Sequence, residues 1–149
     1  GFWQGALDFI RSQLEANRYI LPTDLKLVRL VHSAEEAVNE INQFYANFHS
    51  TRWANRQVGV RMTPPLSERA LAHIQTAFAD LRLSDDFQQL AYGGEEHDEA
   101  HFSHLTRLVF NFTGRNQGRL RELVDYINLP ENWAQAQGKT QQRVAPEPA

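Results

Sequence analysis

Residues 105–113 (LTRLVFNFT) constrain the fold more than any other segment, because polar and apolar side chains alternate along them. A period of two is the spacing of a β-strand, and it puts one mainly apolar set on a single face: Thr106, Leu108, Phe110 and Phe112. Residues 57–62 (QVGVRM) alternate in the same way, with Gln57, Gly59 and Arg61 on the face opposite Val58, Val60 and Met62. Strands of this kind favour a sheet that helices cover on one face.

Helical segments separate and follow these strands. Residues 66–80 have apolar side chains in helical register, and Ser67 is the expected N-cap. After residues 105–113, a second helix is expected to begin at Asn116 and to turn four side chains inward: Leu120, Leu123, Val124 and Ile127. Residues 81–90 are a weaker strand candidate, either as a whole or in their first few residues only. Residues 57–129 therefore predict an α+β module of the order β-α-β-β-α, a ferredoxin-like fold that lacks one strand.

Residues 1–48 show a different order of elements. Apolar residues at helical spacing predict a helix over 2–17. Residues 26–32 (KLVRLVH) predict a short buried strand, and Ser33 and Glu36 have the spacing of a capping box that begins the next helix. Helix, strand and helix with short connections are typical of an α/β fold with a parallel, doubly wound sheet. Because one strand cannot form a sheet, this segment requires strands from elsewhere.

The two remaining segments are polar. Residues 49–56 (HSTRWANR) are interpreted as a linker in which Trp53 is exposed. The tail 130–149 is rich in Gln, Ala and Pro, and we expect it to be disordered apart from an anchor at Trp133. The expected organisation is therefore an α/β part, a linker, an α+β module and a tail: 1–48, 49–56, 57–129 and 130–149.

Composition excludes several classes of protein. The net charge of −3 argues against a general nucleic-acid binder. The absence of cysteine excludes disulfides and thiolate chemistry, and it agrees with a cytoplasmic protein. No segment approaches the ~20 apolar residues of a membrane-spanning helix, so no membrane partner is expected.

Three histidines stand close together in residues 93–104 (GGEEHDEAHFSH). On a helix, His97, His101 and His104 would share a face, and with Glu96 they could bind zinc. The two preceding glycines and the strand that must follow do not favour a helix. A solvated loop is therefore the preferred interpretation, with these three histidines as the metal candidates of the chain.

Residues 113–121 (TGRNQGRLR) are the better ligand candidate, because a strand ends, two glycines allow close approach and a helix begins. The unpaired N–H groups of a helix N-terminus attract anions. The side chains and backbone that would form this anion site are Arg115, Asn116, Gly118 and Arg119. The alternative, which we favour, is a capped turn with solvated arginines. No pair of carboxylates and no local Ser-His-Asp order indicates a catalytic site.

Several short motifs resemble those of one known family. They are Gly1-Phe2-Trp3, ALDFI at 6–10, Tyr19-Ile20, the expected strand 26–32 and SAEEA at 33–37. Together they resemble the final portion of the nucleotide-binding domain in the Lonely Guy (LOG) family of Rossmann-fold proteins. Further along, FYANFHSTRW, FADL and GRLRELVDYIN are similar to longer bacterial members, so the resemblance covers roughly residues 1–128. Asn17-Arg18 departs from the family, which usually has a glycine there.

The resemblance implies an activity for the parent protein. Family members resemble phosphoribohydrolases, which cleave the N-glycosidic bond of nucleoside 5'-monophosphates into a base and ribose 5-phosphate. The family's Pro-Gly-Gly-x-Gly-Thr loop and its downstream Glu are not among these 149 residues. The resemblance therefore assigns no catalytic residue and no cofactor to this chain. We expect a C-terminal fragment of a homo-oligomer, with the nucleotide bound by an upstream domain and with a role in packing, dimerisation or regulation.

A second hypothesis stays open beside the first. The chain could be a non-enzymatic α+β module that binds a ligand or a protein partner without hydrolysis. The coding sequence upstream discriminates between the two, since only the first hypothesis requires the Pro-Gly-Gly-x-Gly-Thr loop there.

Overall fold

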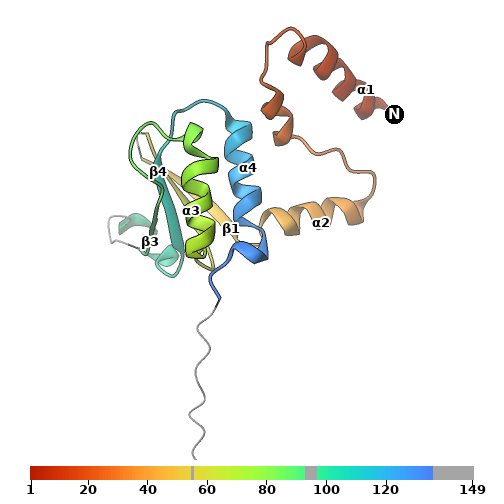
Figure 1. The fold of residues 1–149 in the computed structure, drawn as a ribbon. Helices are drawn as coiled ribbons and strands as arrows, with labels where there is room; N and C mark the ends of the chain where they lie inside the picture. Colours follow the sequence, from red (N-terminus) through yellow and green to blue (C-terminus); the bar gives the residue numbers. More distant parts are fainter. Residues whose placement is uncertain (55, 93–96, 136–149) are drawn as a thin grey trace, which may run out of the picture.

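The structure is a computed structural model that describes residues 1–54, 56–92 and 97–135. Figure 1 shows its main elements, which follow one another as α1 (Phe2–Phe9, continued as a π-helix over Ile10–Glu15), the 3₁₀-helix η2 (Pro22–Leu27), α2 (Ala34–Phe44), β1 (Phe48–Ala54), β2 (Gln57–Met62), α3 (Glu68–Ala77), β3 (Gln88–Leu90), the 3₁₀ segment η4 (His97–Phe102), β4 (Thr106–Asn111) and α4 (Gln117–Ile127). Two shorter 3₁₀ turns lie at Ala79–Leu81 and Pro130–Asn132. Within the described residues, no helix is long and apolar enough to cross a membrane.

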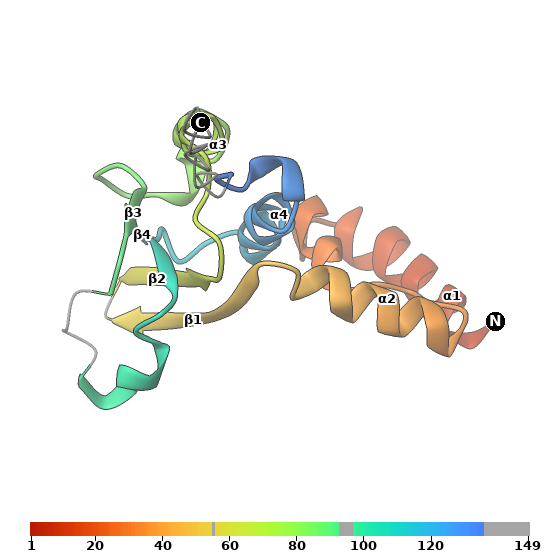
Figure 2. The same ribbon diagram turned by 90° about the horizontal axis from the view of Figure 1, so that it is seen from below.

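The four strands form one antiparallel sheet in the order β1-β2-β4-β3. Helices α3 and α4 both lie on one face of this sheet, as Figure 2 shows from below. The sequence predictions of strands β2 and β4 are confirmed, and so are the helices that follow Ser67 and Asn116. Each of these two residues caps its helix through a side-chain oxygen, as Ser33 does for α2. The chain is thus a mixed α/β protein of the α+β kind.

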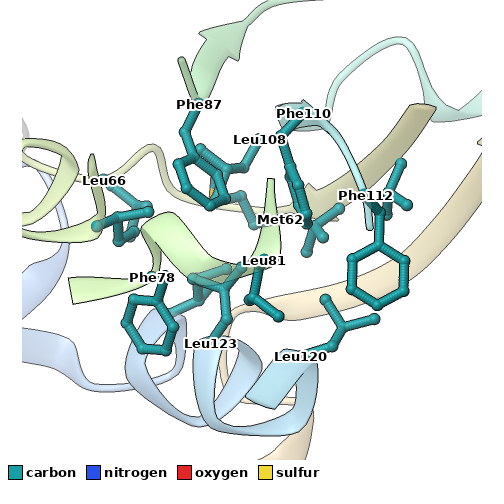
Figure 3. Close-up of a cluster of buried hydrophobic side chains, with 14 of the residues drawn as sticks. Met62, Leu66, Phe78, Leu81, Phe87, Leu108, Phe110, Phe112, Leu120 and Leu123 are labelled. Atoms are coloured by element: carbon teal, nitrogen blue, oxygen red, sulfur yellow. The ribbon is translucent and has the colours of Figure 1, made fainter. Parts of the chain in front are cut away.

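The hydrophobic core lies between the sheet and the two helices (Figure 3). Strand β4 contributes the apolar face that its alternation predicts, and Phe110 packs against Phe87 with 4.6 Å between ring centroids. The other large contributors come from β2, α3 and α4: Val58, Val60, Met62, Ile74, Leu120, Leu123 and Ile127. Burial of each large aliphatic side chain contributes about 1.5–3 kcal/mol, so this layer accounts for most of the stability.

The predicted linker at 49–56 is wrong, because most of these residues form strand β1. Thr51 and Trp53 lie opposite Val60 and Val58 in the β1–β2 ladder. With β1 included, the module has the order β-β-α-β-β-α. Sequence alternation did not reveal β1, because an edge strand outside the core carries polar side chains on both faces. Trp53 is half exposed, as expected.

The strand candidate at 81–90 contains a strand at its end, whereas its first few residues form only an isolated β-bridge between Arg82 and Phe112. Leu81 is fully buried at the end of a 3₁₀ turn, and its N–H donates to the carbonyl oxygen of Phe78 (3.0 Å). The strand forms instead at Gln88–Leu90, after Asp85 has turned the chain with a positive φ of 55°. In a short segment, the sequence does not distinguish an apolar residue at the end of a helix from one at the start of a strand.

No strand forms at 26–32, where one was predicted. Residues 22–27 are a 3₁₀-helix, begun by Pro22 and by the Asp24 carboxylate, which accepts the N–H of Leu21 (2.9 Å). Val28 has an extended backbone (φ −122°, ψ 130°), but no strand among the described residues pairs with it. A strand needs a neighbour to satisfy its backbone groups, so apolar composition alone does not produce one. The helix predicted over 2–17 is confirmed up to residue 15.

Residues 1–45, hereafter the helical arm, contact the module (48–135) mainly where η2 packs on α4. The Thr23 hydroxyl donates to Asn116 Oδ1 at 2.6 Å. Gly118 lies directly beneath Thr23, and a Cβ atom at this glycine would be 1.8 Å from the Thr23 carbonyl oxygen. The first turn of α4 therefore requires a glycine for the arm to pack on it.

Gly118→Ala is expected to release η2 from α4, because the added methyl group meets backbone that cannot move aside. Limited proteolysis with trypsin should then cleave faster after Lys26 than in the unmodified chain. Gly5→Ala is the matched control, since nothing lies within 4 Å of a Cβ atom there and alanine favours a helix by about 1 kcal/mol. Equal cleavage rates in the two variants would contradict this account of the contact.

Candidate functional site

The N-terminus of α4, where an anion site was predicted, is covered by the helical arm. Asn116 Oδ1 accepts the backbone N–H of Arg119 at 3.1 Å and also the Thr23 hydroxyl. Gly118 is buried against the backbone of Thr23. Two of the four predicted site residues thus serve the helix cap and the contact with η2.

The two arginines of the predicted site point to different surroundings. Arg119 donates to both carboxylate oxygens of Asp80 (3.1 and 3.0 Å) and to Glu122 (2.6 Å). The hydrogen bond from Arg119 holds the pKa of Asp80 below its usual value, and that with Asp80 raises the pKa of Arg119. Arg115 is exposed and lines a cavity next to Trp53. Anion binding by all four residues together stays a prediction.

The histidine candidates lie in and just after η4, on the connection between β3 and β4. His101 is exposed and packs against Phe102, with 4.0 Å between ring centroids. His104 Nδ1 lies 3.1 Å from the carbonyl oxygen of His101. The side chain of His97 and all of Glu96 lie outside the described residues. In the part of the chain that is described, no three His, Cys, Asp or Glu side chains are placed to hold a metal ion.

The side-chain cluster that sequence reasoning missed is on the face of the sheet opposite α3 and α4. Arg61 of β2 and Arg107 of β4 lie directly opposite each other in the ladder and are only 2% and 3% exposed. Arg52 of β1 lies on the same side, and Glu99 joins it to Arg61. Alternation had placed Arg61 on this face but could not give the register that brings the arginines together. We call these three residues the arginine cluster.

Segment η4 covers the arginine cluster. One carboxylate oxygen of Glu99 accepts hydrogen bonds from both Arg52 and Arg61. The Phe102 ring lies 4.7 Å from Arg61 Cζ, within the range of a cation–π contact. Arg107 donates to the carbonyl oxygens of Phe102 and Leu105. Buried charges are tolerated when paired and hydrogen-bonded, so the cluster fastens the β3–β4 connection to the sheet.

Two carboxyl groups paired with arginines, Glu99 on this face and Asp80 beside α4, have lowered pKa values. Hydrogen bonds from Arg61 and then Arg52 lower the pKa of Glu99. Arg119 lowers that of Asp80 in the same way. A general acid at neutral pH needs a raised pKa, which neither carboxyl group has.

The helical arm carries a second conspicuous surface. Among the residues of α1, η2 and α2, none is buried, although many are large and apolar. A cavity of about 320 Å³ opens between α1 and the extended residues after η2, and its apolar lining includes Trp3, Leu7, Ile10 and Val28. The most exposed apolar residues of the arm are Phe2, Trp3, Phe9, Tyr19, Val28, Val38, Ile41 and Tyr45.

Comparisons with protein-family models, with curated proteins and with solved structures found no match for this chain.

Glu99→Gln is expected to lower the urea midpoint of unfolding at neutral pH, because it removes a negative charge held by two arginines. A lowered pKa stabilises the fold above the ordinary pKa of glutamate, about 4.3, and this contribution disappears as the pH falls through the folded-state value. The difference between variant and parent should therefore shrink from about pH 7 to about pH 3. Glu131→Gln, at an exposed residue, is the control. A difference that does not depend on pH would refute this assignment.

Proposed function

We propose that this chain is the non-catalytic C-terminal part of a cytoplasmic, homo-oligomeric, LOG-like Rossmann-fold protein. The upstream part of that protein would bind a nucleoside 5'-monophosphate and hydrolyse its N-glycosidic bond to a base and ribose 5-phosphate. The helical arm would complete the nucleotide-binding domain. The module would pack beside it and contribute to dimerisation or regulation.

The observation that carries this proposal is the exposed apolar surface of the helical arm. Phe2 is 81% exposed and Trp3 is 68% exposed, on helices that are too short to be stable alone in water. Burial of each such side chain would stabilise the protein by about 1.5–3 kcal/mol. Large apolar patches of this kind are typical of surfaces that another domain covers.

The extended residues after η2 support the same proposal. Leu27 and Val28 are half exposed, and Val28 has strand-like backbone angles. Extended backbone without a strand neighbour can add to the edge of another sheet. In a doubly wound sheet supplied by an upstream domain, residues 26–32 would become the strand that their composition predicts.

The topology of the module supports a ferredoxin-like assignment. Strands β2 and β3, joined through α3, are separated in the sheet by β4, which is the arrangement of a split β-α-β unit. Strand β1 lies at the edge beside β2, where the last strand of a β-α-β-β-α-β fold would lie. We propose a ferredoxin-like module whose fourth strand comes from the N-terminal side.

The test compares this chain with a longer one that includes the upstream coding region, using release of base from adenosine 5'-monophosphate. Only the longer chain should release base, and it should contain the Pro-Gly-Gly-x-Gly-Thr loop. In the longer chain, Trp3→Ser should lower stability by about 1.5–3 kcal/mol, whereas Gln13→Ser, at an exposed polar position of the same helix, should have little effect. Base release by the 149-residue chain alone would overturn the proposal.

One observation bears on the second hypothesis, a module that binds a ligand. The cavity next to Trp53 is formed entirely by residues of the module and does not involve the helical arm. Ligand binding there is compatible with either hypothesis.

A further inference from the structure

A cavity of about 490 Å³ lies at the end of the sheet where β1, β2 and β4 meet the connection to α4. This volume is within the range of pockets that hold small organic ligands. Its lining comes from four separate parts of the chain: Trp53, Arg56, Leu83, Phe112, Thr113, Gly114 and Arg115.

Backbone hydrogen bonds hold the walls of this cavity in place. The N–H of Phe112 donates to the carbonyl oxygen of Arg56 (2.8 Å), and the N–H of Leu83 donates to that of Asn111 (2.8 Å). The N–H of Thr113 donates to the carbonyl oxygen of Leu81 (2.9 Å). Because these three bonds tie the segments together, the cavity is formed before any ligand arrives, which lowers the entropic cost of binding.

The lining combines an aromatic surface with two cationic side chains. The Trp53 ring packs edge-on to Phe112, with centroids 5.7 Å apart and planes at 67°, and half of Trp53 stays exposed. Arg56 and Arg115 are exposed, and neither forms an ion pair within the described residues. No carboxylate is among the lining residues. An exposed indole accepts a stacked planar ring, and arginine is well suited to bind phosphate.

We propose that this cavity binds a nucleoside phosphate, with the base against Trp53 and the phosphate between Arg56 and Arg115. The base would gain the aromatic surface, and the guanidinium groups would bind the phosphate oxygens. Arg115 thus keeps the anion-binding role that the sequence suggests, but its partner is Arg56 and not the start of α4. The inference is independent of the proposed hydrolase parent, because the site lies wholly within the module.

Isothermal titration calorimetry on the 149-residue chain tests this site with three probes: adenosine 5'-monophosphate, adenosine and inorganic phosphate. The monophosphate should bind at least about tenfold more tightly than either of the other two, because only it uses both halves of the cavity. No binding of the monophosphate at millimolar concentration would overturn the proposal. Equal affinity for adenosine or for phosphate would also overturn it, since one half would then contribute nothing.

Variants locate the binding. The double variant Arg56→Gln, Arg115→Gln should lower the affinity for the monophosphate about tenfold or more and leave the affinity for adenosine unchanged. Both arginines are exposed, so the fold should persist. Trp53→Leu should lower the affinity for both the monophosphate and adenosine. Arg11→Gln with Arg29→Gln removes the same charge from the helical arm and should change neither affinity. An equal loss in this control would show that net charge alone attracts the ligand, which would refute the site.

Discussion

One-sided burial of the antiparallel sheet determines the rest of this structure. The main cluster of buried hydrophobic side chains among the described residues runs from Val58 to Ile127, in the layer that the sheet forms with α3 and α4. This core is complete without the helical arm. The arm is therefore left with apolar side chains that the module has no room to bury, and it contacts the module chiefly through η2 on α4.

The face of the sheet that α3 and α4 cover packs apolar side chains, whereas the opposite face carries the arginine cluster and the β3–β4 connection. Arg61 and Arg107 stand side by side in neighbouring strands, and like charges in that position repel each other. Glu99 and the aromatic rings of the β3–β4 connection compensate for this repulsion. The sheet thus places a hydrophobic layer on one side and a network of arginines on the other, and the cavity beside Trp53 opens at its end.

The sequence predicted the features that depend on local chemistry. Caps at Ser33, Ser67 and Asn116 mark helix starts because a side-chain oxygen needs only an N–H two or three residues away. Alternation predicted β2 and β4 because both strands face the core. Strand β1 escaped prediction because its pairing with β2 is not encoded in an apolar pattern.

The same limit applies to the candidate sites. Register brings Arg61 opposite Arg107, and folding brings Arg115 near Arg56, so neither grouping is visible as a motif. The strand predicted at 26–32 failed for the converse reason: the apolar pattern is present, and the neighbouring strand is not among the described residues.

Hydrogen exchange of the 149-residue chain in dilute solution, measured by mass spectrometry, tests most directly whether the core and the helical arm unfold independently of each other. Amides of β2, β4, α3 and α4 should exchange only through global unfolding. Those of α1 and α2 should exchange orders of magnitude faster, because short helices without burial open readily. Protection of α1 and α2 equal to that of β2 and β4 in a monomer would contradict the account.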